Sequence, residues 1–235
     1  PVVTLKPTDV TVEDPFIGRV IPVHFVDVVP HISGYVDKID VTGGSFVHAG
    51  DVLFQIRSDE FKARRDLAAA DVLKAEADLR NAERYLKRVQ QTKSNALSQT
   101  EIDQAEANYL AAKGTYKAAE ANLSLARIEY DYTRVTAPID GIVGYVNISP
   151  GDYISPESED LIRVIQYHPI RVVFSLSDKE YLAFVTDSLH FLNQGTVRLR
   201  LANGQLYPYV GQLRFLHNEI TSQTSSISAY ADFPN

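Results

Sequence analysis

The sequence predicts an α+β protein with an elongated, nested architecture. A long antiparallel α-helical coiled-coil hairpin is expected to be inserted into a small β-sandwich, and the sandwich into a β-barrel. Three observations predict this order: a long helix-forming stretch in the middle of the chain, a short β-motif that occurs on both sides of it, and β-rich segments at both ends. A chain of 235 residues can bury the cores of two or three such small domains.

The helical hairpin is expected at residues 58–133, a stretch with no proline and one glycine, Gly114. Good helix formers dominate it, and its apolar residues recur in alternating steps of four and three, the heptad pattern of a left-handed coiled coil. The polar residues 92–95 separate two arms of about 33 residues, each about 50 Å long. Ser98 with Glu101 has the spacing of a capping box that begins the second arm. The predicted seams are Ala68, Val72, Ala75, Leu79, Ala82, Leu86 and Val89 on the first arm, and Ile102, Ala105, Tyr109, Ala112, Tyr116, Ala119, Leu123, Ala126 and Tyr130 on the second.

The length of this hairpin limits what it can pack against. The sequence predicts no further helix long enough to complete a bundle with the two arms. The arms are therefore expected to project from the β-domain, or to pack against another chain. The many alanines in the seam predict a close approach of the two helices.

An internal repeat flanks the hairpin. Residues 32–47 match residues 139–154 at a constant offset, and each copy alternates short strands with glycine turns. The two copies are expected to form one sandwich about a pseudo-two-fold axis, from residues 29–57 and 134–167. The paired turn glycines are Gly34 with Gly141 and Gly44 with Gly151.

The ends of the chain, residues 1–28 and 168–235, are expected to form the β-barrel together, because the termini of one domain often lie close together. Asn203-Gly204 is a hairpin-turn signal between two of its strands. One helix, at about 178–192, is expected to interrupt these strands, with Ser177 or Asp178 as its N-cap. The expected strands are 170–174, 196–201, 211–216 and 226–230.

Composition excludes several classes of function. The formal net charge of −7 argues against nucleic-acid binding, which needs clustered Lys and Arg. The chain has no cysteine, so it has no disulfide, thiolate metal site or Cys nucleophile. No stretch is long and apolar enough to span a bilayer, and any targeting segment or anchor is expected to lie outside these residues.

No enzymatic or cofactor site is predicted. The six histidines are scattered without metal-ligand spacing, and no nucleophile elbow, P-loop or dinucleotide fingerprint occurs. A lipoyl or biotin carrier domain needs a lysine on the turn that joins its two halves. In this chain the helical hairpin replaces that turn, so we expect no catalytic residue, no metal and no cofactor.

Six short motifs follow one another along nearly the whole chain: residues 30–36, 47–56, 132–141, 150–154, 167–172 and 231–235. In their order and spacing they resemble those of the AcrA/MexA-like periplasmic adaptors, the membrane fusion proteins of resistance-nodulation-division (RND) efflux pumps in the HlyD superfamily. That family nests a β-barrel, a lipoyl-like domain and an α-hairpin in the predicted order.

The resemblance implies a non-enzymatic adaptor in the periplasm of a Gram-negative bacterium. It would link an inner-membrane RND transporter to a TolC-like outer-membrane channel, and would form a ring of copies, a hexamer in the assembled pump. The family is tethered to the inner membrane by an anchor, expected outside these residues. In the family, the barrel and a membrane-proximal domain would also continue beyond Asn235.

The resemblance also assigns site residues. The family contacts the channel through its hairpin tip, with an Arg, a Leu and a Ser at fixed spacing. Ser98 matches the Ser, but Lys87 and Gln91 stand where the Arg and the Leu are expected. The turns at Gly34, Gly44, Gly141 and Gly151 would line or gate the ring. The expected channel contacts are Arg84, Lys87, Arg88, Gln91, Ser94, Leu97 and Ser98.

Three alternative functions stay open. The chain could serve an ATP-driven (ABC) or major-facilitator (MFS) exporter, which shares the nested architecture. It could be a carrier domain of an enzyme, against which the missing lysine argues. It could also be a structural coiled-coil scaffold, which leaves the β-repeat unexplained.

Overall fold

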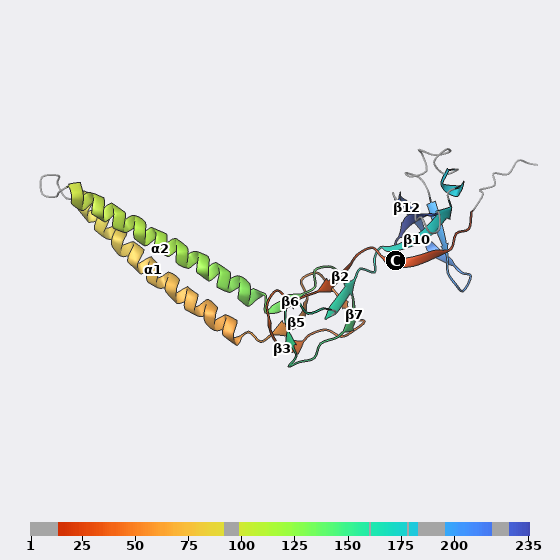
Figure 1. The fold of residues 1–235 in the computed structure, drawn as a ribbon, viewed down its shortest axis with the longest axis horizontal. Helices are drawn as coiled ribbons and strands as arrows, with labels where there is room; N and C mark the ends of the chain where they lie inside the picture. The colour runs from red at the N-terminus through yellow and green to blue at the C-terminus, as the bar shows by residue number, and fades with distance from the viewer. Residues whose placement is uncertain (1–13, 92–98, 160, 178, 183–195, 218–225) are drawn as a thin grey trace, which may run out of the picture. The chain divides into compact units, whose positions relative to one another are not determined.

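The computed structural model describes residues 14–91, 99–159, 161–177, 179–182, 196–217 and 226–235. The chain folds as two compact units (Figure 1). One consists of Pro1–Phe25 with Ile165–Asn235, and the other of Val26–Val164. Each unit is described by itself below. The domain boundaries expected from the sequence stay a prediction.

The middle of the second unit is a pair of antiparallel helices, α1 (Asp59–Gln91) and α2 (Gln99–Asp131), which we call the helical hairpin. The helices lie side by side in Figure 1. Asp59 and Glu60 in the first turn of α1 and Arg88 in its last turn suit the helix dipole. The predicted hairpin is thus confirmed, whereas Ser98, the expected cap of its second arm, lies outside the described residues.

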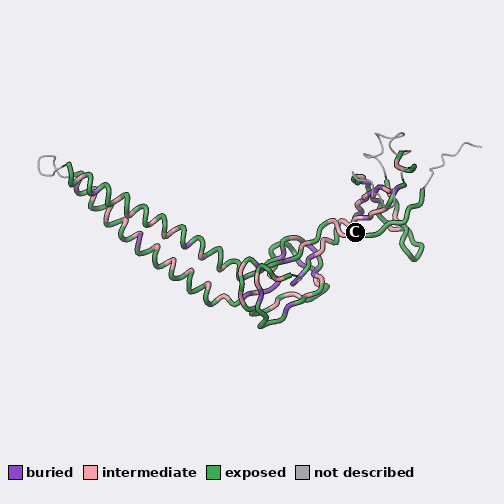
Figure 2. The backbone as a smooth tube through the Cα atoms, viewed as in Figure 1, coloured by how far each residue is buried: buried purple, intermediate pink, exposed green. Residues whose placement is uncertain are grey.

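The predicted seams are the surfaces through which the two helices pack. Ala75, Val89, Ala105 and Leu123 are buried, and the other predicted seam residues are all half-buried. Figure 2 shows this buried side along the inside of the hairpin. At the base, Arg64 Nη1 lies 3.9 Å from Glu129 Oε2, so the start of α1 lies beside the end of α2.

Two four-stranded sheets join the base of the hairpin. The halves of the repeat interlock by hydrogen bonds between their backbones: Gly44 N donates to Val143 O at 2.7 Å, and its counterpart Gly151 N donates to Val36 O at 2.8 Å. The predicted pseudo-two-fold repeat is therefore confirmed in the strand pairing. The strands of the first sheet are, in spatial order, β2 (Phe25–Val28), β9 (Ile162–Ile165), β7 (Gly141–Val146) and β4 (Phe46–Val47). Those of the second are β6 (Arg134–Thr136), β5 (Val52–Ile56), β3 (Gly34–Ile39) and β8 (Tyr153–Ile154).

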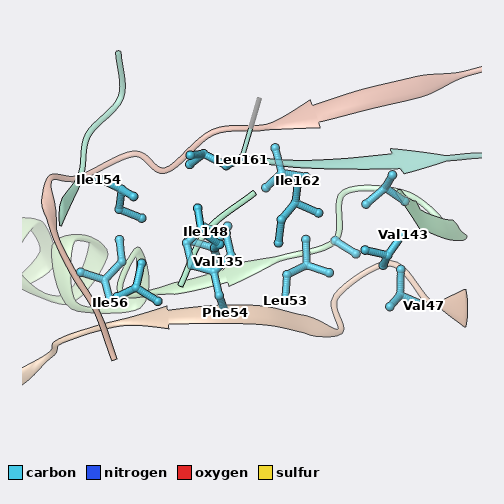
Figure 3. Packing of buried hydrophobic residues seen from close by; sticks show 14 residues of the cluster. Val47, Leu53, Phe54, Ile56, Val135, Val143, Ile148, Ile154, Leu161 and Ile162 are labelled. Atoms are coloured by element: carbon cyan, nitrogen blue, oxygen red, sulfur yellow. The ribbon is translucent and has the colours of Figure 1, made fainter. Parts of the chain in front are cut away.

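A single hydrophobic core lies between these two sheets (Figure 3). Leu53, Phe54 and Val164 are fully buried there. Both halves of the repeat contribute, since Val36 and its counterpart Val143 are each 1% exposed. The hairpin therefore leaves from, and returns to, one continuous core.

The other unit contains a five-stranded antiparallel sheet built from both ends of the chain, as predicted. Its strands, in spatial order, are β1 (Gly18–Pro22), β10 (Ile170–Ser177), β13 (Ser226–Phe233), β12 (Leu206–Leu216) and β11 (Thr196–Arg200). Buried and half-buried residues alternate along β13, which places Phe233 in the core. The ring of Phe233 lies so close to Gly211 that a Cβ there would stand 2.5 Å from it.

The turn and the helix cap that the sequence predicts in this unit are both present among the described residues. Gly204 has a φ of 84° and closes the turn between β11 and β12. Ser177 caps a short helical segment, residues 179–182, since its Oγ accepts from Glu180 N while Ser177 N donates to Glu180 Oε2 at 2.6 Å. The rest of the helix expected at 178–192 lies outside the described residues.

Candidate functional site

The tip of the helical hairpin is the predicted contact with an outer-membrane channel. The described members of the predicted set lie in the final turns of α1 and are all exposed: Arg84, Lys87, Arg88 and Gln91. The remaining members, Ser94, Leu97 and Ser98, lie outside the described residues. The structure thus places part of the predicted tip on one exposed helix end.

The cationic side chains near the tip are held along α1. Arg84 donates to Asn81 Oδ1 at 2.5 Å and to a backbone carbonyl, and the Arg88 guanidinium lies 5.8 Å from the centre of the Tyr85 ring. Lys87 Nζ donates to Glu83 Oε1 at 2.7 Å. That hydrogen bond raises the pKa of Lys87 and lowers the pKa of Glu83. The pair is exposed, so it orients these charges and adds little to stability.

The repeat turns form the second predicted site. Gly44 and Gly151 hold φ values of 85° and 96°, in the left-handed region that glycine adopts without strain. Gly34 and Gly141 were expected in turns, but this was wrong: they are the first residues of the counterpart strands β3 and β7. At Gly34 a Cβ would lie 2.5 Å from Cγ2 of Ile56, so glycine there permits close packing.

Exposed apolar pairs lie beside these turns, and the sequence analysis missed them. Tyr35 and Tyr153 are neighbours on β3 and β8 with ring centres 5.2 Å apart, and they are 49% and 62% exposed. Their counterparts in the repeat, Ile142 and Phe46, are neighbours on β7 and β4. The alternating pattern of the strands in the repeat could have placed these side chains on the outer face, but only the strand pairing makes them neighbours.

The junction between the hairpin and the sandwich is held by backbone hydrogen bonds. Ile56 N, at the end of β5, donates to Thr133 O at 2.7 Å. Thr133 is the one polar residue in the buried set of the described chain, and its Oγ1 donates to Tyr130 O at 2.6 Å. The rings of His31 and Tyr132 pack with centres 4.5 Å apart. These contacts fix where the hairpin leaves the sandwich.

Two features are absent from the described part of the chain. There, no group of three or more His, Cys, Asp or Glu is arranged to hold a metal ion. Nor does any described helix combine the length and apolar character that crossing a bilayer requires.

Two family models match the chain in succession. The model described as RND MFP, barrel-sandwich hybrid domain, matches residues 24–166, and the model described as RND MFPs, beta-barrel domain, matches residues 169–235. The first alone covers more than half of the chain. The chain therefore belongs to the RND membrane fusion protein family.

Curated relatives agree with this assignment. The chain is 34% identical to multidrug export protein AcrE of Escherichia coli K12 over 241 residues, which cover 100% of the chain and 62% of AcrE. It is 32% identical to the efflux pump periplasmic linker BepF of Brucella suis biovar 1, over 94% of the chain and 54% of BepF. It is 34% identical to multidrug resistance protein MdtA of Klebsiella pneumoniae, over 93% of the chain and 53% of MdtA. The chain thus spans less than two thirds of these relatives.

Solved structures share the fold. The membrane fusion protein Spr0693 of Streptococcus pneumoniae R6 matches with a TM-score of 0.69 at 19% identity, over 93% of this chain and 90% of that one. A putative efflux transporter of Bacteroides eggerthii matches with a TM-score of 0.60 at 20% identity, over 94% and 61%. At these identities the likeness concerns the fold alone.

Proposed function

We propose that this chain is part of the periplasmic adaptor of a tripartite multidrug-type efflux pump, linking an inner-membrane RND transporter to a TolC-like outer-membrane channel. The observation that carries the proposal is the succession of both RND membrane fusion models along residues 24–235. The relatives named as a multidrug export protein and as a periplasmic linker support it.

In this proposal the protein catalyses no reaction, and it acts by connecting its partners physically. The helical hairpin extends from the sandwich, and its tip, with Lys87, Gln91 and the residues beyond, contacts the channel. Charges at such a rim set orientation and rate of association more than affinity. The sandwiches pack side by side in a ring, a hexamer in the assembled pump, and the turns at Gly44 and Gly151 face its opening.

The same proposal assigns a role or a residue range to each domain of the chain. The β-barrel, residues 1–28 with 168–235, rests on the periplasmic part of the transporter. The lipoyl-like sandwich comprises 29–57 and 134–167, and the hairpin 58–133. The protein acts in the periplasm of a Gram-negative bacterium, held at the inner membrane by an anchor outside these residues, and binds neither a cofactor nor nucleic acid.

A deletion strain tests this function. Loss of the gene should raise intracellular accumulation of a fluorescent efflux substrate, and a plasmid carrying the full-length wild-type gene should restore efflux. Chemical cross-linking in cells, followed by affinity purification of the tagged protein, should capture an RND transporter. Capture of an ABC or MFS exporter in its place would contradict the proposed class of inner-membrane transporter. Unchanged accumulation of a panel of such dyes would contradict the efflux role.

A further inference from the structure

The five-stranded sheet has a second face, opposite its hydrophobic core, and arginines are concentrated there. On β11, Val197 and Leu199 pack against the buried cluster that contains Phe233. Successive side chains of a strand point to opposite faces, so Arg198 and Arg200 point away from the core. Both residues are exposed.

The same face continues across the sheet to β10. Arg198 pairs with Val210 on β12, and Gln212, two residues further along β12, pairs with Asp232 on β13. Asp232 in turn pairs with Arg171 on β10. Residues that pair across antiparallel strands lie on one face, so Arg171 and Asp232 share the face of Arg198.

Two further arginines belong to this face. Arg214 Nε lies 3.3 Å from Asp232 Oδ2. Arg19 is exposed on β1, two residues before Ile21, which pairs with Arg171. We call this surface the arginine face, and its arginines are Arg19, Arg171, Arg198, Arg200 and Arg214.

The arginine face is positively charged within a chain whose formal net charge is −7. In the described strands Asp232 is the one acid on it, and both Arg171 and Arg214 bind that carboxylate. Among the ion pairs of the described residues, none involves Arg19 or Arg200. Residues 196–217 contain no Asp or Glu at all. The face is therefore complementary to a surface of negative charge.

Exposed apolar side chains lie among these arginines. Leu206 pairs with Arg200 and Val210 with Arg198, and they are 54% and 51% exposed. Residues 200–206, which form the turn between β11 and β12, are all exposed (Figure 2). Arginines beside exposed apolar residues are typical of surfaces that lie in a membrane–water interface. There an arginine packs its aliphatic stem on apolar groups while its guanidinium binds phosphate.

We propose that the arginine face binds an anionic phospholipid bilayer, with its guanidinium groups on the lipid phosphates and with Leu206 and Val210 at the boundary between headgroups and acyl chains. The arginines are spread over four strands, β1, β10, β11 and β12. Lipids diffuse laterally and can meet such spread charges, whereas a folded acidic partner would need carboxylates fixed at matching positions. The inference goes beyond the proposed function and does not depend on it.

Sedimentation with vesicles tests this binding. At low salt the purified chain should pellet with vesicles made of equal amounts of phosphatidylglycerol and phosphatidylethanolamine, and stay in solution with vesicles of neutral phosphatidylcholine. Arg19→Gln combined with Arg200→Gln should weaken the partitioning about 25-fold, because each arginine near an anionic surface contributes a factor of about five. Added salt should weaken the binding of the wild-type chain by screening.

A matched pair of substitutions controls for net charge. Arg127 and Arg134 are also exposed, but they lie in the other compact unit. Arg127→Gln combined with Arg134→Gln removes the same charge and should leave the partitioning unchanged. Soluble glycerol phosphate, compared with sodium chloride at equal ionic strength, should release no more protein than the salt does. This comparison separates a bilayer from free phosphate as the ligand.

A single tryptophan reports which residues meet the lipid. The chain has no tryptophan, so Val210→Trp introduces the one reporter. Its fluorescence emission should shift to shorter wavelength when anionic vesicles are added, because the indole leaves water. Tyr145→Trp, at a position 82% exposed on the sandwich, should show no shift. Leu206→Trp repeats the prediction if Val210→Trp impairs folding.

The inference is overturned if the chain does not pellet with anionic vesicles or pellets equally with neutral ones. Equal losses in the two arginine pairs would assign the binding to net charge and not to this face. An emission shift at position 145 as large as that at positions 210 and 206 would also contradict it. Release by glycerol phosphate beyond the effect of salt would exclude the bilayer as the specific ligand.

Discussion

Asp232 is held by two arginines in the five-stranded sheet. Arg171 donates to both of its carboxylate oxygens, at 2.6 and 3.0 Å, and Arg214 Nε lies 3.3 Å from Oδ2. The side chains of Arg171 and Asp232 are only 20% and 10% exposed. The hydrogen bonds from Arg171 lower the pKa of Asp232 below its ordinary value of 3.8. Bidentate pairs of this kind fix the register of the strands that carry them.

We expect Asp232→Asn to lower the free energy of unfolding by about 1 to 3 kcal/mol at neutral pH, because it leaves a half-buried guanidinium without its counter-charge. A carboxylate whose pKa is lower when folded stabilises the fold above its unfolded pKa, near 4, and loses that effect as the pH falls through the folded pKa. The difference between variant and wild type should therefore shrink below about pH 4. Urea unfolding at several pH values measures it.

The exposed pair Arg163–Asp27 is the matched control, with side chains 48% and 41% exposed. Asp27→Asn should change the unfolding midpoint little, because water screens an exposed pair. Equal losses in the two variants would show that burial does not govern the strength of these pairs.

The positive φ of Gly151 leads to a second prediction. A Cβ there would meet nothing within 4 Å, so Gly151→Ala should cost about 1 to 2 kcal/mol through backbone strain alone. Gly151→Asn should cost less, since Asn tolerates the left-handed region. Thermal unfolding of both variants measures the order, and an Asn variant less stable than the Ala variant would contradict this explanation.

These residues differ in how far sequence predicts them. The turns at Gly44 and Gly151 could be predicted, because a turn with a positive φ depends on the residue at that position, and both copies of the repeat have glycine there. The contact between Arg171 and Asp232 could not, because their strands are distant in sequence and only the register of β10 on β13 makes them neighbours. The same limit applies to Arg163 with Asp27.

The seam and the outer face of α2 give a matched pair of substitutions. Leu123 is 9% exposed in the seam, and Leu125, two residues on, is 61% exposed. Leu123→Ala should lower the stability of the purified chain by about 2 kcal/mol, at the low end for such changes because a two-helix seam buries little. Leu125→Ala should be close to neutral in the same chain. Thermal unfolding followed by helical circular dichroism compares them, and equal losses would contradict the assigned seam.

The helices and the repeat show what heptad spacing can and cannot predict. Steps of three and four predicted both seams, because burial against a partner helix selects apolar residues at that period. The exposed pairs Tyr35–Tyr153 and Phe46–Ile142 were missed, because only the strand pairing makes each pair adjacent.

Partners of the complete protein are less predictable than its fold. Heptads and turns specify how this chain packs on itself, whereas in the proposed function the choice of channel would depend on a few side chains at the tip. Lys87 and Gln91 depart there from the pattern that the resemblance implies. In the proposed function, the choice of transporter would depend on the surface of the β-barrel, where the motif that ends at Phe233-Pro234-Asn235 favours the RND type.

Site-specific photo-cross-linking from the hairpin tip tests the adaptor function most directly. A photo-reactive residue would replace Gln91, the exposed last residue of α1, in the full-length protein in cells, with the same residue at Asp71, exposed far from the tip, as control. The account predicts that an outer-membrane channel is captured from position 91 and not from position 71. Capture from both positions alike, or no capture of a channel from position 91 in cells that express one, would contradict the role of the hairpin as the link to the outer membrane.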